Sequence, residues 1–121
     1  MIGNAVWFEI PTNDFERAIT FYEAVFQVKL RREKIGGDIA VFPGDEPAVT
    51  GALVSQEGYV PAANGAVVYL SAGDDLAPTL ERAVANGGKV VTPKTALPPG
   101  MGHYAHFEDC EGNRVGLHSG N

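Results

Sequence analysis

Residues 5–15 read AVWFEIPTNDF, and residues 66–76 read AVVYLSAGDDL. In each stretch, a segment of β-branched and aromatic residues runs into a polar turn with an acidic residue, and a helical pattern follows. Sliding one stretch onto the other by about 61 residues aligns Val6 with Val67 and Asp14 with Asp75. A repeat of this length indicates a duplicated structural module.

The first copy reads as one strand, one helix and three further strands. Apolar residues at helical spacing predict a helix from Phe15 to Phe26, with Asn13 as its N-cap and Glu16 as the capping-box partner. Pro11 is expected to end the preceding strand. Strands are then predicted over residues 28–34, 38–42 and 49–55.

The second copy follows the same order. After a strand over residues 66–72, a helix is expected with Asp74 as its cap and Pro78 in the tolerated first turn. A strand beginning at Lys89 is expected to break at Pro93. The last two strands are predicted over residues 103–108 and 114–118. We expect residues 1–58 to form the first βαβββ module and residues 59–121 the second.

Composition narrows the functional class. A chain of 121 residues, 45% of them hydrophobic, can build one domain with a real core. The absence of a long apolar run or a signal-like N-terminus, together with the single Cys110, predicts a cytoplasmic protein that does not enter membranes. The net charge of -6 argues against nucleic acid as a partner.

The end of the chain carries a further signature. Residues 107–117 read FEDCEGNRVGL, in which an Asp-x-x-x-Asn turn precedes the last strand. Together with the duplicated βαβββ order, this resembles the vicinal oxygen chelate superfamily, which includes glyoxalase I, fosfomycin-resistance proteins, extradiol dioxygenases and bleomycin-resistance proteins. The resemblance implies an α+β fold of tandem modules whose open, cup-shaped mixed sheets carry helices on the convex side. It also implies a small-molecule ligand in the cup and a homodimer.

The resemblance places the family's metal ligands on residues that cannot bind metal. In metal-using members the ligands come from the first, fifth and last strands. These positions fall on Trp7, Val68 and Gly116, none of which offers an imidazole, carboxylate or thiolate. The usual metal site is therefore expected to be absent, and no cofactor is expected.

Two titratable residues lie two positions along the strand from Trp7 and from Gly116. Residues two apart in a strand share a face, so Glu9 is expected beside Trp7, and His118 beside Gly116. Glu9 is a candidate general base and His118 its acid partner. The alternative is that both residues only satisfy polar groups in a wet cavity. A rearranged divalent metal site from Glu9, His118 and either His103 or His106 is a further hypothesis.

The candidate ligand-contacting residues share a place on the first, fifth and last strands or close to them; they are Trp7, Val68, Leu70, His103 and Gly116. The function predicted from this set is metal-free binding of a small organic molecule in the cup. The alternative is an isomerase or lyase that uses Glu9 as its general base, with or without a rearranged metal site.

Overall fold

The computed structural model describes residues 2–45 and 48–121. The first half contains β1 (Trp7–Pro11), α1 (Phe15–Phe26), β2 (Arg31–Lys34), β3 (Asp38–Val41) and β4 (Thr50–Ser55). The second half contains β5 (Tyr69–Ser71), α2 (Ala77–Ala85), β6 (Lys89–Ala96), β7 (His103–Glu108) and β8 (Arg114–Ser119). The predicted α+β fold with two βαβββ units is confirmed.

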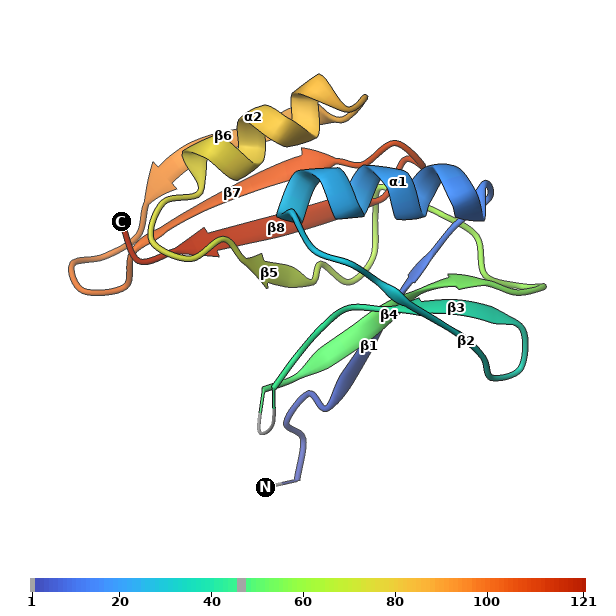
Figure 1. Ribbon diagram of the computed structural model, residues 1–121. Coiled ribbons are helices and arrows are strands. Elements are labelled where there is room, and N and C mark those ends of the chain that lie inside the picture. Colours follow the sequence, from blue (N-terminus) through green and yellow to red (C-terminus); the bar gives the residue numbers. More distant parts are fainter. Residues whose placement is uncertain (1, 46–47) are drawn as a thin grey trace.

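Each unit forms its own four-stranded sheet. The strand orders are β1-β4-β3-β2 and β5-β8-β7-β6, and in each sheet the first strand pairs in parallel with the last while the other pairs are antiparallel. Both helices lie on the same side of the molecule, so the opposite face of each sheet is left open (Figure 1). The module boundary expected between residues 58 and 59 falls in the segment that joins the sheets and stays a prediction. Within the described residues, no helix is long and apolar enough to cross a membrane.

A single apolar core lies between the helices and the two sheets. Alternate residues of the last two strands, including Phe107 and Leu117, are fully buried there with Tyr22 of α1. A second, smaller cluster lies on the open face of the first sheet and consists of Ile39, Val41, Ala52 and Val54. The strands therefore bury apolar side chains in two directions in the first module and mainly toward the helices in the second.

The helix caps differ from the sequence-based expectation. Asp14, not Asn13, caps α1, because its carboxylate accepts a hydrogen bond of 3.1 Å from the backbone N–H of Arg17. The N–H groups of Asn13 and Asp14 are instead bonded by Glu111 from the other module, which fixes where the helix begins.

The second helix also begins later than expected. It starts at Ala77 with Pro78 in the first turn, and Leu76 at the cap position supplies no side-chain hydrogen bond. Asp75, rather than the predicted Asp74, accepts a hydrogen bond of 3.0 Å from the N–H of Ala77.

The strand that contains Pro93 does not break there. β6 continues to Ala96 through register shifts between Val90 and Thr92 and between Thr92 and Thr95. β6 is an edge strand, and proline is tolerated at bulges and edges because no ladder hydrogen bond is required of it there. The regular parts of β2 and β5 are shorter than the predicted strands 28–34 and 66–72.

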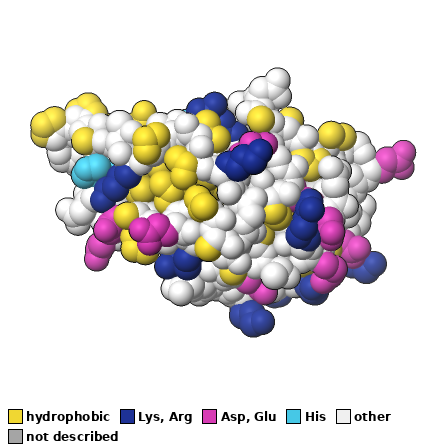
Figure 2. Space-filling model, turned by 90° about the horizontal axis from the view of Figure 1, so that it is seen from above, with side chains coloured by type: hydrophobic (Ala, Val, Ile, Leu, Met, Phe, Trp, Pro, Cys, Tyr) yellow, Lys and Arg dark blue, Asp and Glu magenta, His cyan; other side chains and the backbone are white. Residues whose placement is uncertain are grey.

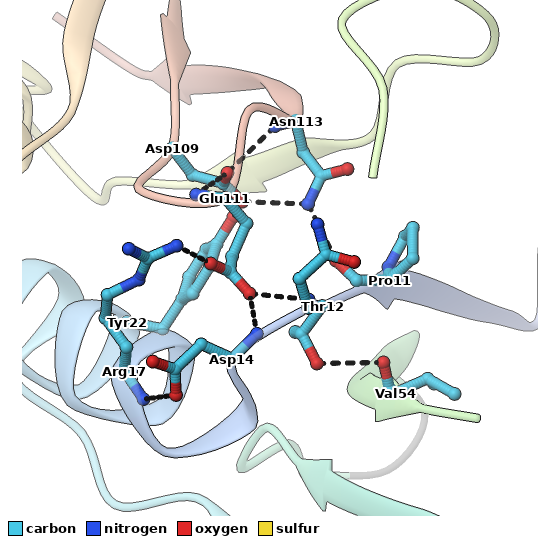
Figure 3. Close-up of polar contacts among 10 residues, drawn as sticks. Pro11, Thr12, Asp14, Arg17, Tyr22, Val54, Asp109, Glu111 and Asn113 are labelled. Carbon is cyan, nitrogen blue, oxygen red and sulfur yellow. Dashed lines mark hydrogen bonds and ion pairs between the residues drawn. The ribbon is translucent and has the colours of Figure 1, made fainter. Parts of the chain in front are cut away.

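The turn between the last two strands joins the modules (Figure 3). Asp109 accepts a 2.6 Å hydrogen bond from the buried Tyr22 hydroxyl, and Asn113 Nδ2 donates to the carbonyl of Pro11 at 2.8 Å. Glu111, whose side chain is fully buried, accepts from the first backbone N–H groups before α1 and forms an ion pair with Arg17. A carboxylate at this position also interacts favourably with the helix dipole.

We expect the Tyr22→Phe variant to lower the free energy of unfolding by about 2 kcal/mol, the usual contribution of a hydrogen bond to a charged group. Burial and the neighbouring Asp109 raise the pKa of Tyr22 well above its ordinary value, so the hydroxyl remains a donor at neutral pH. Urea unfolding measures the change. Tyr104→Phe is the matched control, since the Tyr104 hydroxyl has no hydrogen-bond partner among the described residues, and its change should stay within about 0.5 kcal/mol. Equal losses in both variants would contradict the prediction.

Candidate functional site

The open face of the second sheet carries aromatic and polar side chains. Along β7, Ala105 and Phe107 point into the core, so the alternation turns Tyr104 and His106 to the open face. The strand register places Gly116 beside His106 and Tyr69 beside Gly116. Three neighbouring strands thus bring their side chains to one surface.

These side chains surround a hollow of about 460 Å³ on the open face. Its lining consists of Tyr69, Leu97, Tyr104, His106 and His118. The His106 ring lies 5.2 Å from the ring of Tyr69 and 5.6 Å from that of Tyr104, centre to centre. A concave site with aromatic walls and few polar groups has the size and character of a small-molecule site.

Hydrogen bonds connect Tyr69, which lines the hollow, through His106 to Arg114. The Tyr69 hydroxyl lies 2.6 Å from Nε2 of His106. On the other side of the same ring, Nη2 of Arg114 lies 2.8 Å and Nε 3.2 Å from Nδ1. Burial, and secondly the charge of Arg114, lower the pKa of His106, so the ring is neutral at physiological pH.

His118 forms another wall of the hollow. Its Nε2 lies 2.8 Å from the carbonyl oxygen of Met101, in the loop before β7. Among the described residues, the structure shows no hydrogen-bond partner for the other ring nitrogen, Nδ1. His118 and Gly116 both lie on the open face of β8, since the register sets them beside Ser71 and Tyr69.

Glu9 lies in a different hollow, between the two modules. This hollow, of about 470 Å³, is also lined by Val68 and Arg114. Trp7 shares the face of Glu9 and donates from its indole nitrogen to the carboxylate at 3.3 Å. A hydrogen bond with Glu9 also raises the pKa of the Tyr59 phenol. Glu9 and His118 line separate hollows, so one chain does not bring this predicted acid–base pair together.

Val68, Leu70 and His103, which the sequence suggests as ligand contacts, lie on the core-facing side of their strands. Val68 and Leu70 pack against the core, and Tyr69 between them faces the open side. His103 shares the face of Ala105 and Phe107, which leaves His106 as the histidine of β7 on the open face. The β5 positions were predicted with the 61-residue shift that aligns the helices, whereas the strands correspond with a shift one residue shorter. A slip of one residue exchanges the two faces of a strand.

Cys110, in the turn beside Tyr22, offers no nucleophile. Burial, together with the nearby Asp109 and Glu111 carboxylates, raises the pKa of its thiol to about 11. The thiol is therefore protonated at neutral pH.

The model of the Glyoxalase/Bleomycin resistance protein/Dioxygenase superfamily matches residues 4–117. The chain belongs to this superfamily. A glyoxylase-like domain-containing protein of Didymella fabae is 34% identical over 117 residues, which span 92% of this chain and 89% of that protein.

Solved structures share the fold at lower identity. A glyoxalase/bleomycin resistance protein from Streptomyces sp. CB03234 has a TM-score of 0.71 at 23% identity, with 96% of this chain and 100% of that chain covered. TnmS3, described as an antibiotic binding protein from the same organism, has a TM-score of 0.67 at 22% identity, with 100% and 99% covered. At these identities the likeness concerns the fold.

The residues of this superfamily member do not fit a divalent metal at the usual positions. The ring of Tyr69 lies over Gly116 so closely that a Cβ atom on residue 116 would stand 2.4 Å from Cδ2 of Tyr69. A metal-binding side chain on residue 116 therefore has no room while Tyr69 keeps this position. Among the described residues, no group of three or more His, Cys, Asp or Glu side chains could hold a metal ion.

A third hollow, also largely apolar, lies on the helix side of the molecule. Figure 2 shows hydrophobic side chains gathered on this face, where α2 and β6 line a shallow hollow of about 350 Å³. Its apolar lining includes Leu80, Val84 and Val90. Because it lies across the sheet from the hollow around Tyr69, it provides control positions for testing that site.

Proposed function

We propose that this protein binds a small, largely apolar organic molecule on the open face of the second sheet. The observation that supports this most is the hollow of about 460 Å³ between the rings of Tyr69 and Tyr104, with Leu97 as an aliphatic wall. Aromatic rings offer large, rigid contact surfaces for flat apolar ligands. TnmS3, which shares the fold, is described as an antibiotic binding protein. We infer the same general role here, without a cofactor.

We expect Leu97→Asp to reduce binding of 8-anilinonaphthalene-1-sulfonate at least tenfold, because a carboxylate placed in an apolar wall must be desolvated by the dye. Fluorescence titration measures the affinity. Val84→Asp is the matched control, as it makes the same change in the helix-side hollow. Loss of dye binding in Val84→Asp alone would move the site to the helix side and contradict the proposal.

We propose that two copies of the chain pair through their open faces. Trp7 is 42% exposed and Tyr69 48% exposed, and both alternate with core-packed neighbours, so their side chains face away from the helices. Contiguous exposed apolar surface marks interaction sites, and pairing through the open faces would cover Trp7 and Tyr69 together. The net charge of -6 argues against nucleic acid as a partner. The single cysteine fits a cytoplasmic setting, and we propose no membrane partner.

The mass of the protein in solution tests the pairing. We expect sedimentation velocity to give a dimer for the unmodified chain and a smaller species for Trp7→Lys, because a buried ammonium at the interface is costly. Val84→Lys makes the same kind of change on the helix side and should remain dimeric. A monomer at all concentrations, or a dimer lost only in Val84→Lys, would contradict pairing through the open faces.

A second candidate function is an isomerase or lyase with Glu9 as general base. The position of Glu9 in the hollow between the modules favours it, since Arg114 lines the same hollow and could stabilise an enolate that forms there. In such a step the C–H bond next to a carbonyl breaks, its proton moves to the Glu9 carboxylate, and the electron pair moves to the carbonyl oxygen.

Deuterium uptake at the methyl group of acetophenone, followed by NMR in D₂O, tests this reaction. We expect the unmodified protein to accelerate exchange and Glu9→Gln to reduce the rate at least a hundredfold, the usual contribution of a general base. Glu57→Gln removes an exposed carboxylate that lies outside the hollow and should retain the rate. Exchange at the uncatalysed rate in every sample would leave binding as the function.

A further inference from the structure

Two side chains contact the His106 ring. The Arg114 guanidinium can only donate hydrogen bonds, whereas the Tyr69 hydroxyl can donate or accept. A guanidinium has no acceptor, so the Nδ1 atom that faces Arg114 at 2.8 Å must accept. A neutral imidazole carries one proton, which then resides on Nε2. Arg114 therefore determines which tautomer His106 adopts.

The tautomer determines what the Tyr69 hydroxyl can do. With its proton on Nε2, His106 donates to the Tyr69 oxygen across 2.6 Å. The hydrogen of the Tyr69 hydroxyl is then not used by His106. No other acceptor for it is present among the described residues, and Tyr69 lines the hollow, so this hydrogen is available to a bound molecule.

We propose that Arg114 and His106 hold the Tyr69 hydroxyl as a hydrogen-bond donor that selects ligands carrying an acceptor oxygen on an apolar body. This inference rests on the proposed function, because it concerns the hollow that we assign to the ligand. The apolar body would pack against Tyr104 and Leu97, and its oxygen would face Tyr69. Both a neutral carbonyl and a carboxylate provide such an oxygen, and the nearby positive charge of Arg114 suits either one.

The same hydrogen bonds show why Arg114 is needed for the Tyr69 hydroxyl to act as a donor. If Arg114 were absent, His106 could carry its proton on Nδ1, and Nε2 would then accept from the Tyr69 hydroxyl. The hydroxyl hydrogen would be occupied and the ligand would meet only oxygen lone pairs. Arg114 is thus a positioning residue, which acts on the ligand through His106 and Tyr69.

The tautomer is measured directly by long-range ¹H–¹⁵N NMR of the imidazole. We expect Nε2 of His106 to be protonated and Nδ1 to be unprotonated in the unmodified protein, and the Arg114→Met variant to shift toward protonated Nδ1. Arg31→Met removes the same charge from the exposed strand β2 and should leave the tautomer as it is. Protonated Nδ1 in the unmodified protein would overturn the inference.

Ligand preference is measured with three probes by NMR titration: acetophenone, ethylbenzene and benzoate. Ethylbenzene has nearly the shape of acetophenone but no oxygen, so we expect acetophenone to bind about fivefold more tightly, the effect of one hydrogen bond. In Tyr69→Phe and in Arg114→Met this preference should fall to about one, with ethylbenzene affinity retained. Benzoate binding that exceeds acetophenone binding and falls in Arg114→Met would identify the oxygen as that of a carboxylate.

The outcomes separate this inference from the proposed function. Equal binding of acetophenone and ethylbenzene, or a preference that survives Tyr69→Phe, overturns the donor role while the hollow remains a binding site. If none of the three probes binds, the proposed function fails, and the acceptor preference fails with it.

Discussion

The structure depends on one buried carboxylate. Glu111 lies in the turn between the last two strands, yet it accepts from backbone N–H groups that precede the first helix, and it pairs with Arg17. Asp109 and Asn113 of the same turn reach Tyr22 and the end of β1. A buried carboxylate must be hydrogen-bonded, and the partners of Glu111 come from the first module, so this contact holds the two modules together. The relative position of the open faces follows from this contact.

The architecture could be predicted because the apolar residues are periodically spaced and the sequence repeats after about 61 residues. Apolar spacing located the first helix, the repeat and the turn residues located the second, and the family resemblance implied the mixed sheets. The details that failed depend on contacts distant in sequence. Asn13 was predicted as the cap of α1, but in the structure its N–H group donates to Glu111 from the distant turn. Pro93 was predicted to end a strand, but β6 continues through register shifts beside it. Neither the contact with Glu111 nor the irregular pairing of β6 can be predicted from the residues next to Asn13 or Pro93.

The candidate site was harder to predict, because it depends on which side each strand faces. The 61-residue repeat predicts Val68 and Leu70 as ligand contacts, whereas in the structure Tyr69, which lies between them, faces the open side. A usable signal was present in β7, where Ala105 and Phe107 mark the core face and leave His106 on the other. The bonds of His106 to Arg114 and Tyr69 cross three strands, so only the register of the folded sheet brings them together.

Gly116 illustrates how the site differs from a metal centre on the same fold. Read from sequence, glycine here is a missing ligand. In the structure it is the residue that allows the Tyr69 ring to lie against the backbone of β8, where any side chain would collide with it. The same placement brings the Tyr69 hydroxyl to His106. Tyr69 and Gly116 therefore belong to one arrangement, in which a neutral hydrogen-bond donor faces the hollow where a cation would require ligands. A carboxylate placed at residue 116 would displace the Tyr69 ring. The hydrogen-bond donor would then be lost, whether or not a metal site formed.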